Sequence, residues 1–180
     1  MKDEQKKILG EKRRDLLLQW LKDSNAPLTG SDLSKRTNVS RQVIVQDISL
    51  LKARNEPIMA TSQGYLYMSR TQAEQKQTRI IACKHGPDES ERELLLLVDH
   101  GVTVKDVIVE HSVYGELTAS LGLRNRKDVA NFIDKIRSAK AAFLLELTKG
   151  GHLHTVEADS SKQLDEACDA LREAGILVEE

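Results

Sequence analysis

The sequence contains few aromatic residues, two cysteines and no long apolar segment. Aromatic side chains make up 3% of its 180 residues, too few for the base-stacking surfaces that bind single-stranded nucleic acids or RNA. Cys83 and Cys168 form no metal-binding or redox spacing motif, which favours a reducing compartment. No apolar run approaches the roughly 20 residues of a membrane span, and the N-terminal residues carry no signal-peptide core. We therefore expect a cytoplasmic protein.

Charge is distributed unevenly along the chain. The formal net charge is −1, but residues 1–70 hold 13 Lys and Arg against 8 Asp and Glu, whereas residues 71–180 hold 14 against 20. A basic half can neutralise phosphates, while an acidic half should stay away from DNA. The length suits one large or two small domains, each able to bury a core. These features predict a nucleic-acid-binding N-terminal domain and a second domain with another role.

Residues 28–48 show the pattern of two short helices joined by a tight turn. Ser40 is a natural N-cap for the second helix, because its hydroxyl can accept from a free backbone N–H. From there Ile44, Ile48 and Leu51 recur at i, i+4 and i+7 and form one inward-facing stripe. This is the pattern of a helix-turn-helix.

The side chains outside that stripe are suited to the major groove of DNA. Arginine pairs with guanine O6 and N7, glutamine pairs with adenine N6 and N7, and an apolar side chain can contact a thymine methyl. We predict that Ser40 contacts the DNA backbone. The residues predicted to contact base edges are Arg41, Gln42, Val45 and Gln46.

The flanking segments predict the winged form of this motif. An apolar face on residues 11–24 indicates a preceding helix, and Pro57 ends the recognition helix. Residues 58–68 then read as a β-hairpin that turns at Ser62-Gln63-Gly64. In this wing, Gln63 and Tyr65 are the predicted contacts to the DNA backbone.

The winged helix-turn-helix domain is expected at residues 1–69 and is followed by a polar linker at 70–78. In the remaining region, 79–180, strand and helix patterns alternate. The expected strands are 79–84, 102–110, 114–121, 142–148, 152–158 and a short edge strand at 176–179, and the expected helices are 88–100, 125–139 and 160–174. Lys149-Gly-Gly151 predicts a hairpin between the strands at 142–148 and 152–158. The whole is an α+β fold, whose second domain is an open-faced sandwich with helices on one side of a mostly antiparallel sheet.

Histidines dominate the chemistry of the second domain. His152 and His154 are two residues apart on an expected strand, so both rings leave the same face. Imidazole is a common transition-metal ligand, but this pair alone is a weak signal and needs further ligands. His85 ends the first expected strand of the domain and Glu93 lies on the next helix. Cys83 is on the same strand face as His85, and its thiolate is as good a candidate for a further metal ligand as the Glu93 carboxylate.

Three segments of the chain resemble the NiaR (YrxA-type) repressors of bacterial NAD biosynthesis, in which a winged helix-turn-helix precedes a three-histidine domain. The segments are Ser40-Arg-Gln-Val-Ile-Val-Gln-Asp-Ile48, Asp106-Val-Ile-Val-Glu-His-Ser-Val-Tyr-Gly115 and Gly151-His-Leu-His-Thr155. The resemblance covers nearly the whole chain, and the second and third segments are its more specific part. It implies an HPr-like α/β sandwich for the second domain. It also implies a metal site whose ligands are His85, Glu93, His152 and His154.

The resemblance further implies a repressor of genes for NAD biosynthesis or niacin uptake, with nicotinic acid as corepressor. Three imidazoles and one carboxylate suit one divalent transition metal per chain, such as nickel or zinc, and do not suit calcium or magnesium. From residue type and position, His111 and Tyr114, with Arg124 or Arg126, are candidates for polar contacts with the effector. We interpret His100 as a structural residue at a helix C-terminus.

One helix-turn-helix reads only a few base pairs, so we expect a homodimer on an inverted-repeat operator. The first alternative is a metal-dependent, amidohydrolase-like hydrolase fused to a DNA-binding module, against which the sequence shows no spare general base and no nucleophile motif. The second is a repressor that senses the metal itself.

Overall fold

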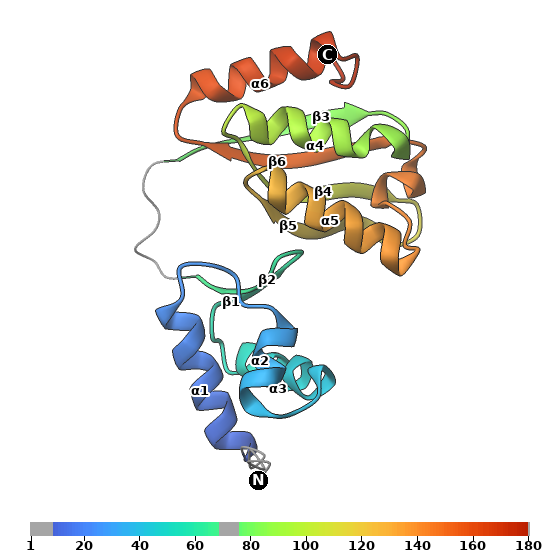
Figure 1. The fold of residues 1–180 in the computed structure, drawn as a ribbon. Coiled ribbons are helices and arrows are strands. Elements are labelled where there is room, and N and C mark those ends of the chain that lie inside the picture. The colour runs from blue at the N-terminus through green and yellow to red at the C-terminus, as the bar shows by residue number, and fades with distance from the viewer. Residues whose placement is uncertain (1–8, 69–75, 180) are drawn as a thin grey trace. The chain divides into compact units, whose positions relative to one another are not determined.

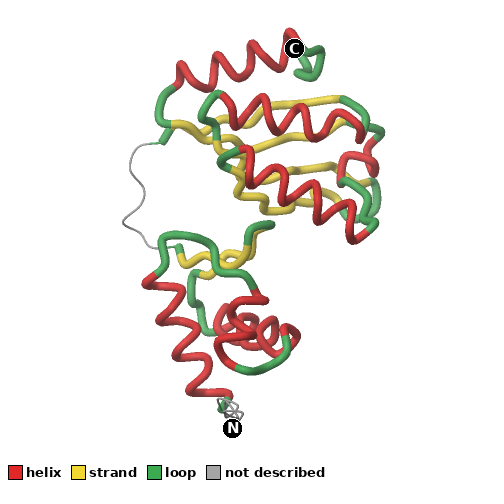
Figure 2. Tube along the Cα trace, in the orientation of Figure 1, coloured by secondary structure: helices red, strands yellow, loops and turns green. Residues whose placement is uncertain are grey.

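A computed structural model describes residues 9–68 and 76–179 of the chain. The chain divides into two compact units, Met1–Gln72 and Ala73–Glu180, whose elements are drawn in Figures 1 and 2. Each unit has its own hydrophobic core. Residues 70–75 of the expected linker lie outside the described residues. No helix within the described ranges has the length and apolar character needed to cross a membrane.

The N-terminal unit is the predicted winged helix-turn-helix. Its elements are α1 (Gly10–Asp23), α2 (Gly30–Thr37), α3 (Arg41–Ala53), β1 (Ile58–Thr61) and β2 (Gly64–Tyr67). The strands β1 and β2 form an antiparallel hairpin, and Leu28 pairs with Tyr65 through two backbone hydrogen bonds of 2.8 Å. The predicted stripe of Ile44, Ile48 and Leu51 is buried against α1 and α2.

Local capping explains where these helices begin and end. The Thr29 hydroxyl accepts from the backbone N–H of Asp32, and the Ser40 hydroxyl accepts from that of Val43 at 3.3 Å, as predicted for a helix N-cap. Asn38 ends α2 in the left-handed conformation, at φ 52°. The wing requires glycine at position 64, because a Cβ there would lie 2.6 Å from the carbonyl oxygen of Leu28.

The C-terminal unit is the predicted open-faced sandwich. Its elements are β3 (Gln77–Lys84), η2 (Pro87–Glu89), α4 (Ser90–Asp99), β4 (Thr103–His111), β5 (Gly115–Leu123), α5 (Arg126–Ala139), η3 (Leu144–Thr148), β6 (Gly151–Ala158) and α6 (Ser161–Glu173). The sheet order is β3-β6-β4-β5, with every pair antiparallel. Helices α4, α5 and α6 lie on one face of this sheet (Figure 1).

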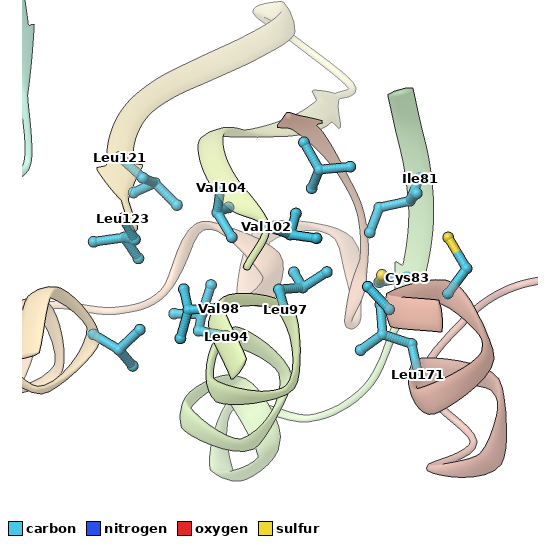
Figure 3. Close-up of a cluster of buried hydrophobic side chains, with 14 of the residues drawn as sticks. Ile81, Cys83, Leu94, Leu97, Val98, Val102, Val104, Leu121, Leu123 and Leu171 are labelled. Carbon is cyan, nitrogen blue, oxygen red and sulfur yellow. The ribbon is translucent and has the colours of Figure 1, made fainter. Parts of the chain in front are cut away.

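The core of this unit lies between that sheet face and the helices. Figure 3 shows Leu94, Leu97 and Val98 of α4 directed toward apolar side chains that include Val104 of β4 and Leu121 of β5. All of these side chains are buried. The apolar residues of α4 therefore face the sheet at the helical spacing seen in the sequence.

One expected strand is wrong: residues 142–148 contain the 3₁₀ helix η3 instead. The central strand β6 has β3 on one side and β4 on the other, so no edge of β6 is free to accept a hairpin partner. Locally, the Phe143 N–H donates to the Glu146 carboxylate at 2.8 Å and caps the 3₁₀ turn. The Lys149-Gly-Gly151 turn exists, but it connects a helical turn to a strand.

The short strand expected at 176–179 is reduced to an isolated β-bridge beside β3. Leu177 forms an antiparallel bridge with Cys83. The Val178 N–H donates to the carbonyl of Ala82, and the Lys84 N–H donates to that of Ile176, both at 2.9 Å. This pairing covers the outer edge of β3.

Candidate functional sites

The recognition helix presents the predicted polar face to solvent. Arg41, Gln42 and Gln46 are exposed on α3, and Val45 retains 39% of its accessible surface. The burial of the opposite stripe fixes this helix against its domain and leaves these four side chains outward. The arrangement has the chemistry needed to contact base edges in a major groove.

The two predicted wing residues occupy different environments. Gln63 lies in the turn of the hairpin and is half-buried. Tyr65 is also half-buried; its backbone is paired with Leu28, and its ring lies near Gly30 at the start of α2. Tyr65 therefore helps join the wing to the helical part of its own domain.

A buried ion pair between α1 and α3 was not predicted from the sequence. The Arg13 guanidinium donates to the carboxylate of Asp47 at 2.5 and 3.3 Å, and Arg14 donates to it at 3.3 Å. Arg13 and Asp47 are both buried. The only sequence signal was the position of Asp47 next to Ile48, on the inward side of the recognition helix.

In the C-terminal unit, the four residues implied as metal ligands come together. His85 directly follows β3, Glu93 is on α4, and His152 and His154 are on β6. All four are buried, and Glu93 is only 1% exposed. The Glu93 carboxylate lies at the centre: Nε2 of His85, His152 and His154 lie 2.8, 3.1 and 3.4 Å from its nearest oxygens.

Backbone geometry brings His85 to this cluster. Gly150, at φ 95°, lies so close to His85 that a Cβ would be 2.3 Å from the His85 carbonyl oxygen. The backbone N–H of His85 donates to the Gly150 carbonyl at 3.3 Å. Because only glycine fits there, the Lys149-Gly-Gly151 turn positions the end of β3 beside the start of β6.

Each of the three histidines is oriented by a backbone carbonyl. The Nδ1 atoms of His85, His152 and His154 lie 2.7, 2.9 and 2.6 Å from the carbonyl oxygens of Gly86, Gly150 and Asp106. A carbonyl oxygen can only accept, so each Nδ1 carries a proton. In the neutral ring, the lone pair is then on Nε2, which in all three histidines faces the Glu93 carboxylate.

Such an arrangement is electrostatically incomplete unless a cation or protons lie between these atoms. Burial alone lowers the pKa of His85 and His154, but hydrogen bonding and the charge of Glu93 outweigh it, and the net pKa is raised. Burial raises the pKa of Glu93, whereas the charges and hydrogen bonds of the histidines lower it well below its usual value. Nε2 of His154 is buried and still lacks a properly aligned hydrogen-bond partner.

Cys83, the alternative ligand considered above, borders the same cluster. Its Sγ, a Glu93 oxygen and a His152 nitrogen all lie within 4.8 Å of one another. Burial, followed by the charge of Glu93, raises the pKa of the Cys83 thiol strongly. The thiol form therefore prevails near neutral pH, and its S–H is a weak donor beside the carboxylate.

A cavity of about 150 Å³ opens beside the histidine cluster. Ser90, Glu93, His152 and His154 form its polar end. The remainder is apolar and comes from α4, the strands β4 and β5, α5 and the segment before β6: Leu94, Val107, Ala119, Leu121, Phe132, Ile136, Ala142, Phe143, Leu144 and Leu145. The rings of Phe132 and Phe143 contact each other edge to face, with centroids 6.3 Å apart.

The residues proposed from sequence for effector contacts lie elsewhere. His111 and Tyr114 are at the turn between β4 and β5, where the His111 Nδ1 accepts from the backbone of residues 113 and 114. Tyr114 is 75% exposed. Neither these two nor Arg124 and Arg126 are among the described residues that line the cavity.

His100 has the structural position expected of it. It is the C-cap of α4, and its Nδ1 donates to the Leu96 carbonyl at 2.7 Å. This contact satisfies a carbonyl group in the last turn of the helix.

A winged DNA-binding domain joined to a domain with a buried histidine cluster is the organisation of a transcription regulator. Comparison with known proteins supports this class. Residues 13–66 match the model of an HTH domain, and residues 78–180 match that of the 3H domain.

The chain is also similar over nearly its whole length to two named repressors. It is 59% identical over 178 residues to the transcription repressor NadR of Bacillus subtilis, a match covering 98% of this chain and 99% of the relative. It is 36% identical over 174 residues to a probable transcription repressor NiaR of Thermotoga maritima, covering 97% and 98%. The chain therefore belongs to the NadR/NiaR family of transcription repressors, and the family resemblance inferred from the sequence is confirmed. Because these relatives are named repressors and not enzymes, the hydrolase interpretation is not supported.

Proposed function

We propose that the protein represses genes of NAD biosynthesis or niacin uptake, with a divalent transition metal in the histidine cluster and nicotinic acid as corepressor. The observation that carries this proposal is the convergence of three Nε2 atoms and one carboxylate beside a cavity that is apolar elsewhere. We interpret this set as a binding centre and not as a catalytic one, in keeping with relatives that are named repressors.

The donor set fits a metal such as nickel or zinc. Each imidazole is already fixed in the tautomer that offers Nε2, since Nδ1 is held by a carbonyl, which is the usual outer contact of a metal-bound histidine. Nε2 of His154 lies 3.4 Å from the Glu93 carboxylate without an aligned hydrogen bond, so a cation could bind it there. A bound metal would supply positive charge at the polar lining of the cavity, which would attract an anionic ligand.

The cavity fits the ring of a pyridine carboxylate. A space of about 150 Å³ is enough for a benzene-sized group, and its apolar walls favour a flat ring. Ligand binding in this domain then raises operator affinity, as expected of a corepressor. The residues that bind DNA are in the other unit, so the coupling is a property of the whole chain.

The DNA-binding part of the proposal places Arg41, Gln42, Val45 and Gln46 against base edges. Replacing Arg41 by alanine should weaken binding to the specific operator by about 1–3 kcal/mol and relax specificity at the contacted base pair. Gel-shift or fluorescence titrations against operator and random DNA measure both effects. An equal loss on the two DNAs would reduce Arg41 to a phosphate contact.

A direct test combines metal analysis, ligand binding and DNA binding on the purified full-length protein. We expect one metal ion per chain, thermal stabilisation by nicotinate but not nicotinamide, no turnover of either, and tighter operator binding with nicotinate. Operator binding that responds to the metal and ignores nicotinate would instead support a metal-sensing repressor. Turnover of nicotinamide to nicotinate would restore the hydrolase.

A further inference from the structure

The cavity beside the histidine cluster contains a second unsatisfied polar group, the hydroxyl of Ser90. Among the described residues, three buried side-chain nitrogen or oxygen atoms lack a hydrogen-bond partner: Arg14 Nε, Ser90 Oγ and His154 Nε2. Two of the three line this one cavity. Ser90 is only 3% exposed, so bulk water has little access to hydrogen-bond with its hydroxyl. A buried polar group without a hydrogen-bond partner calls for an explanation.

Helical geometry directs this hydroxyl to the polar end of the cavity. Ser90 is the first residue of α4, and Glu93 follows it by three residues, which places both side chains on the same face of the helix. Glu93 is at the centre of the histidine cluster. The Ser90 hydroxyl therefore lies on the side of the cavity that Glu93 and His154 line.

The charge of the lining determines how an anionic ligand can be oriented. The described lining residues include no lysine and no arginine. A carboxylate directed into the apolar part would lose its hydration without compensation. Its charge can be met only at the histidine end, where a divalent cation would more than offset the single charge of Glu93.

We propose that Ser90 is a specificity residue, whose hydroxyl donates a hydrogen bond to the carboxylate of a single-ring aromatic acid held at the histidine end of the cavity. The ring of that ligand then lies in the apolar part of the cavity, toward Phe132 and Phe143. This inference rests on the proposed metal and corepressor function. It assigns the carboxylate, and not the ring nitrogen, to the metal-binding end. An amide at the same place lacks the negative charge, which explains selection of the acid.

The first test replaces Ser90 by alanine, which removes one oxygen atom and is well tolerated in a helix. Calorimetric titration of nickel-loaded full-length protein should show nicotinate affinity reduced about tenfold or more, because the lost hydrogen bond is to a charged group. Metal content should remain one ion per chain. Ser138→Ala, on the exposed face of α5, is the matched control and should bind nicotinate like the wild type.

Nicotinate affinity unchanged in Ser90→Ala would overturn the assignment of Ser90 while leaving the proposed function intact. No nicotinate binding by the metal-loaded wild type would overturn both. Loss of metal together with nicotinate binding in Ser90→Ala would show that Ser90 supports the metal centre, and the specificity role would be wrong.

The second test uses two ligand fragments in competition with nicotinate. Benzoate retains the carboxylate and lacks the ring nitrogen, whereas 3-methylpyridine retains the nitrogen and lacks the carboxylate. We expect benzoate to compete, with its own affinity reduced in Ser90→Ala by about the same factor as that of nicotinate, and 3-methylpyridine not to compete. The opposite ranking would place the ring nitrogen at the histidine end and overturn the proposed orientation.

Discussion

At the scale of single residues, the backbone contacts of the three histidines determine which ring nitrogen is available for binding. Each Nδ1 is committed as a donor to a backbone carbonyl, so Nε2 is the only atom that can bind a proton or a metal. Because all three Nε2 atoms face one carboxylate, the cluster needs positive charge in every state. Bound protons would supply that charge in the metal-free protein, and a metal ion would displace them.

This competition gives opposite pH dependences with and without metal. The pKa values of His85 and His154 are raised in the fold by Glu93, against the effect of burial, so their contribution to stability is complete below the unfolded value of about 6.5 and is lost as pH rises through the raised values. The lowered pKa of Glu93 contributes stability above its usual range, which is lost only as pH falls through the lowered value.

We therefore expect the chelator-treated protein to lose stability as pH rises above about 6.5, while the stabilisation by added nickel or zinc grows with the same rise in pH. Thermal unfolding of the C-terminal unit at pH 5.5 and pH 8, with and without metal, measures both trends. An increment from metal that is as large at pH 5.5 as at pH 8 would contradict the assignment of the imidazoles as ligands.

The pair on β6 provides the mutational test. The double change His152→Ala and His154→Ala should abolish metal binding and the response to nicotinate, while basal DNA affinity stays close to that of the wild type because the recognition helix is in the other unit. His100→Ala removes an imidazole of the same domain outside the cluster and serves as the control. A double mutant that still responds to nicotinate would make the metal structural and place the effector site elsewhere. Elemental analysis and operator titration give the two readouts.

At the scale of elements, α1 and α3 are joined by both apolar contacts and the buried Arg13–Asp47 pair. Removing one partner of such a pair leaves an uncompensated buried charge, which costs about 3–5 kcal/mol. We expect Asp47→Ala to destabilise the N-terminal unit by this amount and to leave the C-terminal unfolding transition unchanged. Asp23→Ala, at an exposed position on α1, should change stability by no more than about 0.5 kcal/mol. Denaturant unfolding followed with a separate probe in each unit measures these effects. If both units unfolded in a single transition shifted equally by Asp47→Ala, the loss of stability would not be confined to the N-terminal unit.

Sequence reasoning succeeded for the elements whose signals are local. These signals lie in one continuous stretch of the chain: the N-cap Ser40, the stripe of Ile44 and Ile48, and the turn before Gly64. Each follows from periodicity or turn chemistry. The strand expected at 142–148 was wrong. Both edges of β6 are paired, with β3 and β4, and this arrangement depends on the whole sheet and not on the local sequence. The Lys149-Gly-Gly151 turn was read as a hairpin signal, although its glycine serves contact with His85.

The candidate metal site was predictable in part. The alternation of His152 and His154 on one strand indicated these two ligands. The residues alone did not distinguish Cys83 from Glu93 as a further ligand, and only the family resemblance favoured Glu93. The structure brings both to the cluster and puts the carboxylate at its centre. The carbonyl contacts at Nδ1 and the unsatisfied Ser90 hydroxyl depend on residues far apart in sequence, so no local pattern could reveal them.

At the scale of the whole molecule, each chain has one recognition helix, and the exposed face of that helix is long enough to contact only a few base pairs of DNA. Specific affinity of a repressor usually comes from two such helices on half-sites about one helical turn apart, or a multiple of it. We therefore expect a homodimer that binds an inverted-repeat operator far more tightly than a single half-site.

Sedimentation equilibrium at micromolar concentration, with and without operator, measures the assembly. Titrations against the full operator, one half-site, and an operator with an insertion of half a helical turn measure the geometry. The insertion should weaken binding strongly, because it rotates one half-site to the opposite side of the duplex. A protein that is monomeric in both conditions would rule out the dimer, and one that tolerates the insertion would rule out a fixed spacing of the half-sites.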